Sequence, residues 1–149
     1  MSTFLLMGVE YPVETPKSPT MCWQIYDFLL EQTRTGKVSL IVPATLLGMY
    51  IASPKLRKEL MEKATKADPH ARPPSIAQDR LLPASIEVSD LINLHNQQQV
   101  ADVMNQATMI RQIFQRETLV YQEAEKSLGN SSPSHSTKSS SEQPGGGEA

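Results

Sequence analysis

The residue types that most often carry out chemistry are few in this chain and widely spaced. There is one cysteine, Cys22, and there are three histidines, His70, His95 and His135, no two of them close in sequence. A metal site or a Cys–His nucleophile pair needs such side chains to converge, as in HxxxH, HExxH or CxxC, and none of these spacings occurs. Beside Trp23 in an apolar segment, Cys22 is typical of an inert core thiol. We therefore expect no metal site and no catalytic residue.

Glycine patterns that bind phosphate are missing as well. Neither GxGxxG nor GxxxxGK[ST] occurs, and Thr35-Gly36-Lys37 lacks the earlier glycine of a phosphate loop. Glu87 and Asp90 share one face of a predicted helix, but carboxylates near a helix start are ordinarily there for the helix dipole. We expect neither a bound cofactor nor an enzymatic activity.

The composition predicts one domain without a strong electrostatic field at its surface. The chain has 149 residues, of which 39% are hydrophobic, enough for one ordinary core. Its 14 basic and 16 acidic residues give a net charge of −2, which does not attract nucleic acid or an anionic membrane. One cysteine cannot form an intrachain disulfide, and the first residues lack the pattern of a signal peptide. These features predict a reducing, cytoplasmic location.

Two Ser-Pro pairs mark the starts of predicted helices. At 18–19 and again at 53–54, a capping serine precedes a proline at the first helical position, where its missing N–H removes no hydrogen bond. They predict helices over 19–35 and 54–67. A glycine follows the first helix and Asp-Pro follows the second, as expected for helix ends.

Residues 38–54 form an uncharged run between these helices. Pro43 divides the run into VSLIV and ATLLGMYIA, which predicts a buried strand followed by a turn and a helix. The length touches the lower limit of a membrane-spanning helix, so a membrane-associated component using 38–52 is one alternative function. The run also contains small residues at four-residue spacing, which let another helix pack closely. These are Ala44, Gly48 and Ala52.

The predicted helix over 54–67 carries the one cluster of basic residues in the chain. Glu59 and Glu62 lie one turn from lysines, so a solvated helix face explains the pattern at least as well as phosphate binding does. A nucleic-acid-binding accessory protein is therefore an alternative function, with nucleic acid an unfavoured partner. Its contacts would be Lys55, Arg57, Lys58, Lys63 and Lys66.

Residues 85–128 contain no glycine or proline. A single helix of that length would be about 66 Å long, whereas a compact domain of this size has a radius of gyration of about 14 Å. The polar run at 95–99 interrupts the apolar pattern and begins like a capping box with asparagine as the cap. The stretch therefore divides into a short helix that begins at Ser85 or Ser89 and a longer one.

The longer helix carries apolar residues in a three–four repeat over four heptads, with Glu117 the one polar member. Neighbouring apolar residues widen this face between 103 and 121, which is typical of a bundle. Packing within the chain and packing with a partner remain equally open. In the leading interpretation the face at 100–128 binds a protein partner or a second copy of the chain. Its contact residues would be Val100, Val103, Ala107, Ile110, Phe114, Tyr121 and Leu128.

Three segments lie outside the predicted helices. Residues 4–9 are expected to form a short strand or extended arm, and 68–84 a proline-rich connector. Residues 129–149 are rich in Ser and Gly and hold no large apolar residue, which predicts a disordered tail. The chain is therefore expected to be mainly α, with a small helical bundle at 1–128. Its predicted function is that of a non-enzymatic helical protein–protein interaction module, such as an assembly factor, adaptor or structural subunit.

Overall fold

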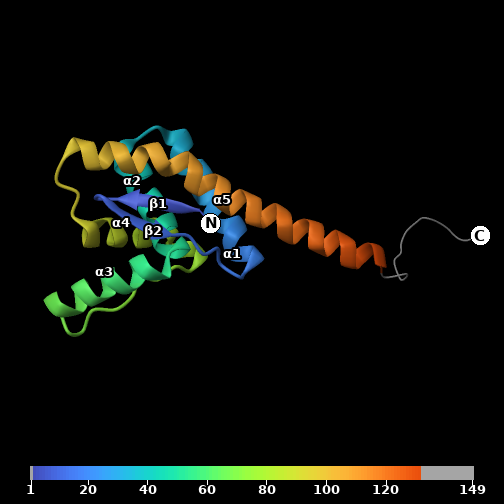
Figure 1. The fold of residues 1–149 in the computed structure, drawn as a ribbon, viewed down its shortest axis with the longest axis horizontal. Helices are drawn as coiled ribbons and strands as arrows, with labels where there is room; N and C mark the ends of the chain where they lie inside the picture. The colour runs from blue at the N-terminus through green and yellow to red at the C-terminus, as the bar shows by residue number, and fades with distance from the viewer. Residues whose placement is uncertain (1, 132–149) are drawn as a thin grey trace, which may run out of the picture. The chain divides into compact units, whose positions relative to one another are not determined.

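The computed structural model describes residues 2–131, with side chains as far as Leu128. Within these residues it contains five α-helices, one short 3₁₀ helix and a two-stranded sheet, so the mainly α class is confirmed (Figure 1). The chain divides into two compact units, residues 1–118 and residues 119–149. Most of the predicted tail, residues 132–149, lies outside the described residues.

The N-terminal segment is a β-hairpin rather than a single strand or arm. Strand β1 (Thr3–Leu6) pairs antiparallel with β2 (Val9–Pro12). Met7 and Gly8 connect the strands, and both have positive φ, at 51° and 81°. Two such residues are what a tight two-residue hairpin turn requires. Alternate side chains of the hairpin are buried, and these are Phe4, Leu6 and Tyr11.

Both Ser-Pro helix starts are confirmed. Helix α1 spans Pro19–Thr35, and the Ser18 hydroxyl accepts a hydrogen bond from a backbone N–H of the first turn. Helix α3 spans Pro54–Ala67, and Ser53 caps it in the same way. Gly36 ends α1 with φ at +67°, a left-handed conformation that glycine adopts without steric cost.

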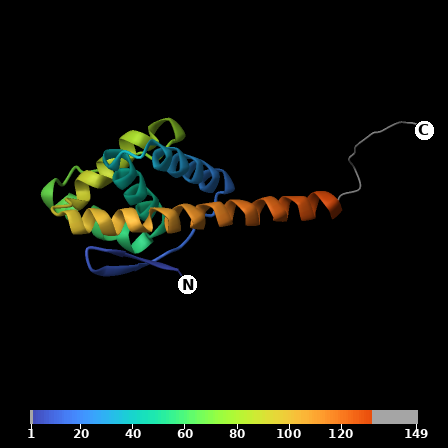
Figure 2. The ribbon, with the colours of Figure 1, turned by 90° about the horizontal axis from the view of Figure 1, so that it is seen from above.

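Between them lies one continuous helix, α2 (Val38–Ala52), so the predicted strand and turn before Pro43 are wrong. A proline inside a helix removes one backbone hydrogen bond. Here that loss is offset by burial, because every residue from Ile41 to Ala52 is buried. Helix α2 packs against α1, α3 and α4 (Leu81–Ile92) and is the centre of the core (Figure 2).

No single helix among the described residues is long and apolar enough to span a membrane. Helices α2 and α3 meet the length and composition criteria only when taken together, and they are bent by 109° at their junction.

The proline-rich connector is shorter than predicted. A 3₁₀ turn, η1 (Gln78–Arg80), leads directly into α4, which begins at Leu81 rather than at Ser85 or Ser89. Pro83 lies in the first turn of α4, where backbone N–H groups have no partner within the helix. Proline is therefore compatible with this helix start.

The predicted break near residues 95–99 is confirmed. Helix α5 (Gln97–Ser131) begins after Asn96, whose side-chain oxygen accepts from the Gln99 N–H at 2.8 Å. The Gln99 side chain in turn accepts from the His95 N–H at 3.1 Å. The helix continues to Ser131, into the first residues of the segment 129–149 predicted to be a disordered tail.

The part of α5 within residues 97–118 runs beside the hairpin (Figure 2). The Gln106 side chain accepts from the Leu5 N–H at 2.7 Å and donates to the Leu5 carbonyl at 2.5 Å. It thereby satisfies backbone groups of β1 that the two-stranded sheet leaves unpaired.

Candidate functional site

The thiol of Cys22 lies fully inside the core. Its Sγ donates to the Pro16 carbonyl at 3.4 Å. Burial, with a contribution from the Glu117 carboxylate, raises the pKa of Cys22 to about 11. A nucleophilic thiol needs a lowered pKa and access to substrate, and Cys22 has neither.

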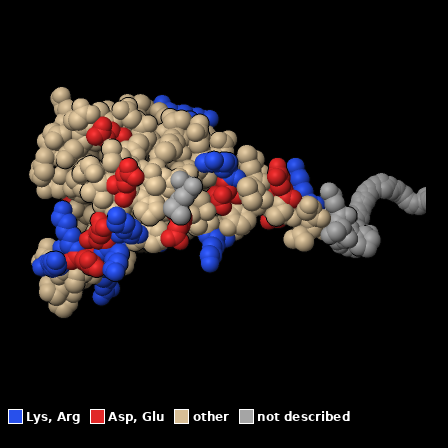
Figure 3. Space-filling view, in the orientation of Figure 1, with Lys and Arg blue, Asp and Glu red and all other residues tan. Residues whose placement is uncertain are grey.

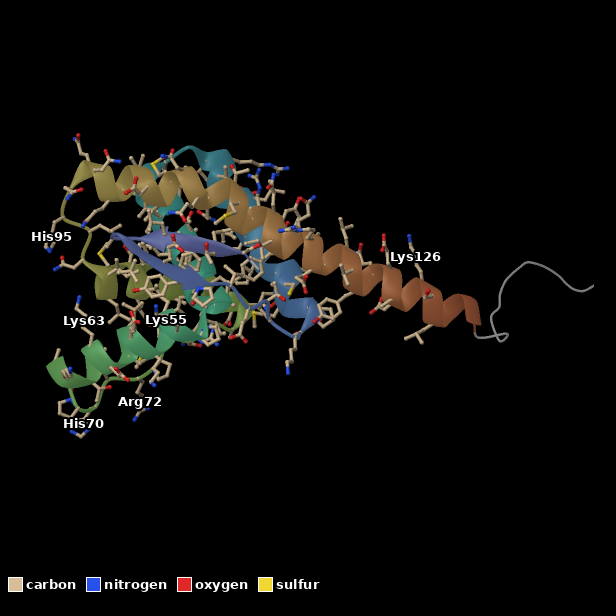
Figure 4. The ribbon with its side chains drawn as sticks, viewed as in Figure 1. Lys55, Lys63, His70, Arg72, His95 and Lys126 are labelled. Carbon is tan, nitrogen blue, oxygen red and sulfur yellow. The ribbon has the colours of Figure 1, made fainter. Side chains whose placement is uncertain are left out.

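The two described histidines lie on separate loops. His70 follows α3, and its backbone N–H donates to Asp68, whereas His95 lies between α4 and α5. In Figure 4, His70 and Arg72 point away from α3. Among the residues placed by the structure, no three His, Cys, Asp or Glu side chains are grouped so as to hold a metal ion. The third histidine of the sequence, His135, lies outside the described residues.

Basic side chains of α3 make contacts within the chain itself. Lys55 Nζ lies 5.2 Å from the centroid of the Tyr11 ring, and Lys63 Nζ lies 3.5 Å from the Leu91 carbonyl oxygen. Figure 4 shows Lys55 and Lys63 extending from α3 on the side of the hairpin and α4.

Arg57 stabilises the end of the central helix. Its guanidinium donates to the carbonyls of Tyr50 at 3.0 Å and Ile51 at 2.6 Å, near the C-terminus of α2. A cation there satisfies carbonyls that have no partner within the helix and interacts favourably with the helix dipole. Arg57 therefore has a structural role.

The basic residues that remain, Lys58 and Lys66, are exposed, but carboxylates lie among them. Figure 3 shows Lys or Arg and Asp or Glu side chains intermingled over α3, at the lower left of the view. On this face of the molecule, the mixed charges give no continuous positive stripe along which a phosphate backbone could lie.

Tyr11 links the hairpin to α3. Its hydroxyl donates to the Glu59 carboxylate at 2.8 Å. Burial raises the pKa of Tyr11 to about 12, and the hydrogen bond and the negative charge of Glu59 act in the same direction.

Raising the pH is expected to destabilise the protein from about pH 9 upward. The folded chain keeps the Cys22 proton to about pH 11 against an ordinary 9.0, and the Tyr11 proton to about 12 against 10.0. The stability that each group contributes is complete below the ordinary pKa and is lost as pH rises through the folded value. The urea midpoint of the wild-type protein should fall as the pH is raised from about 8 to 12. Above about pH 10, the midpoint of Tyr11→Phe should fall less steeply than that of the wild type. Equal slopes for both proteins would contradict a role for Tyr11.

The apolar seam of α5 is covered by the chain itself over its inner part. Gly48 of α2 lies against Ile110 and Phe114. Glu117, the polar member of the seam, accepts a hydrogen bond from the Thr15 hydroxyl at 3.0 Å. The seam residues that are buried are Val103, Ala107, Ile110 and Phe114, while Val100 is half-buried.

The second unit contains the rest of the predicted partner surface. Tyr121 is half-buried, and Leu128 is 71% exposed. Outside the seam, Leu119 and Val120 are 51% and 56% exposed. The sequence identified the face but gave no signal for where on the helix the side chains become exposed.

The comparisons with known proteins give no further lead. No protein-family model matches the chain, and no curated protein or solved structure gives a significant match.

Proposed function

We propose that this protein is a non-enzymatic helical protein–protein interaction module of the cytoplasm. Its contact surface is the part of α5 within 119–128, which binds an amphipathic helix of a partner protein or of a second copy. The observation that carries this proposal is the pair of adjacent large apolar side chains, Leu119 and Val120, each more than half exposed. Val120 lies one turn before Ala124 and two turns before Leu128, so these three exposed apolar residues share one face of the helix, the spacing by which a helix contacts another helix.

The rest of the segment supports the same function. Ala124 and Leu128 continue the three–four repeat, and both are exposed. Residues 119–131 of a helix span about 20 Å, which is room for about two heptads. An interface of that length is small, so we expect concentration-dependent or partner-assisted binding rather than a permanent dimer.

Light scattering after size exclusion tests the proposal. Wild-type protein at rising concentration should exceed the 16.5 kDa of one chain, and Leu119→Asp/Val120→Asp should remain at that mass. Two charges on a desolvated contact cost several kcal/mol, whereas on exposed positions they leave folding within about 1 kcal/mol of wild type.

The matched control is Thr65→Asp/Gln97→Asp. Both positions are exposed and lie outside residues 119–128, and the variant adds the same two charges. It should associate as wild type does. If wild type stays monomeric up to about 1 mM and no partner protein is retained by the immobilised chain, the proposed function is wrong.

A further inference from the structure

The first unit has a groove between α1 and the corner where η1 meets α4. Its volume is about 370 Å³. Apolar walls come from both sides, with Trp23 and Phe28 on α1 and Leu82 on α4. We call this hollow the Trp23 groove.

The indole of Trp23 is unusually accessible for a side chain of its size. It is 51% exposed, and Leu82 across the groove is 40% exposed. The Tyr26 ring lies beside the indole, with 6.2 Å between the ring centroids. An aromatic side chain that is supported on one side and open on the other is typical of recognition surfaces.

The charges of the groove have one sign. Its lining includes the carboxylates of Asp27, Glu31 and Asp79 and no lysine or arginine. Glu31 faces Arg34 at 3.8 Å, in an exposed pair of the same helix. No ion pair within the described part of the chain involves Asp27 or Asp79. A cation placed here meets two carboxylates and an exposed indole.

We propose that the Trp23 groove binds a protein segment that carries an arginine beside a leucine-like side chain. The planar guanidinium stacks on the indole of Trp23 and donates to Asp27 and Asp79, a combination that lysine does not match. The apolar neighbour packs against Phe28 and Leu82. The charge of the lining selects this occupant, because an acidic or neutral segment would leave the carboxylates without compensation.

This proposal does not depend on the surface at 119–128. The Trp23 groove lies entirely within residues 1–118. Loss of one binding activity should therefore leave the other unchanged.

The chain has a single tryptophan, so intrinsic fluorescence reports directly on the groove. The probe is an acetylated and amidated hexapeptide of alternating leucine and arginine, titrated into the full chain. A peptide with glutamate in place of arginine is the control. We expect a saturable change in Trp23 emission with the arginine peptide alone, and several-fold weaker binding in about 0.5 M NaCl.

The variant Asp27→Asn/Asp79→Asn removes the two carboxylates at exposed positions. It should weaken binding of the arginine peptide by about three- to tenfold. The variant Glu10→Gln/Glu62→Gln, which removes two exposed carboxylates elsewhere, should bind as wild type does. Circular dichroism establishes that both variants are folded.

Several results would overturn the proposal. The proposal is wrong if the glutamate peptide gives an equal response, or if the emission change does not saturate up to about 5 mM peptide. It is also wrong if Asp27→Asn/Asp79→Asn binds the arginine peptide with unchanged affinity. A titration with calcium chloride alone is the remaining test. If it reproduces the emission change and blocks the peptide, the groove is a cation site and not a peptide site.

Discussion

Replacing Ile110 with aspartate is expected to unfold residues 1–118. Ile110 is 0% exposed, and its Cγ2 lies 2.7 Å from the point where a Cβ on Gly48 would stand. A carboxylate there has no cationic partner among the side chains that cover Gly48, so burying it costs several kcal/mol. That loss is comparable with the total stability of about 5–15 kcal/mol of an ordinary domain.

Urea denaturation followed by circular dichroism measures the effect. Leu119→Asp places the same carboxylate on the same helix at a position that is 51% exposed, and it should change stability by only about 0.5 kcal/mol. A folded Ile110→Asp with an unchanged midpoint but lost association would show that Ile110 faces a partner instead of the core.

The features predicted to within a residue or two are those set by local hydrogen bonds. Ser18 and Ser53 each accept from an N–H of the helix that follows, and Asn96 does so at the start of α5. Gly36 ends α1 because of its own backbone freedom. Each of these signals involves residues within one helical turn, so no knowledge of the tertiary fold is needed.

The errors at Pro43 and Pro83 have a different origin. The sequence predicts Pro43 to lie between a strand and a helix and Pro83 to lie in the extended connector, yet both lie inside a helix. Pro83 is in a first turn, where its missing N–H has no consequence. Pro43 does remove a hydrogen bond, and the helix persists because other elements bury it on all sides. That second effect is tertiary and could not be predicted from local sequence.

The candidate sites were only partly predictable for a related reason. A heptad pattern shows which residues of α5 share a face, but not that Ile110 on that face packs against Gly48 whereas Leu128 on the same face is exposed. The Trp23 groove gave no sequence signal, because Asp79 belongs to an element far along the chain. A site whose residues are brought together only by the tertiary fold can be recognised only once the structure is known.

Replacing Gly48 with valine is expected to destabilise the first unit by about 3 kcal/mol or more. A Cβ on Gly48 would lie 2.7 Å from Ile110 Cγ2 and 3.3 Å from Leu29 Cδ1. Both neighbours are buried, so neither can move aside without disturbing the core. Helix propensity alone predicts the opposite sign, since valine is a better helix former than glycine. The urea midpoint therefore decides between packing and propensity.

A double-mutant cycle tests whether the Ile110 side chain is responsible. Ile110→Ala removes Cγ2 and by itself costs about 2–5 kcal/mol through the cavity that it leaves. In the combined variant the valine methyl groups occupy that cavity, so the total loss should be smaller than the sum of the two single losses. If the two losses simply add, close contact with Ile110 is not the reason that α2 carries a glycine at this position. Non-additivity of 1 kcal/mol or more, about the size seen for residues in contact, would establish that α2 and α5 pack closely through Gly48.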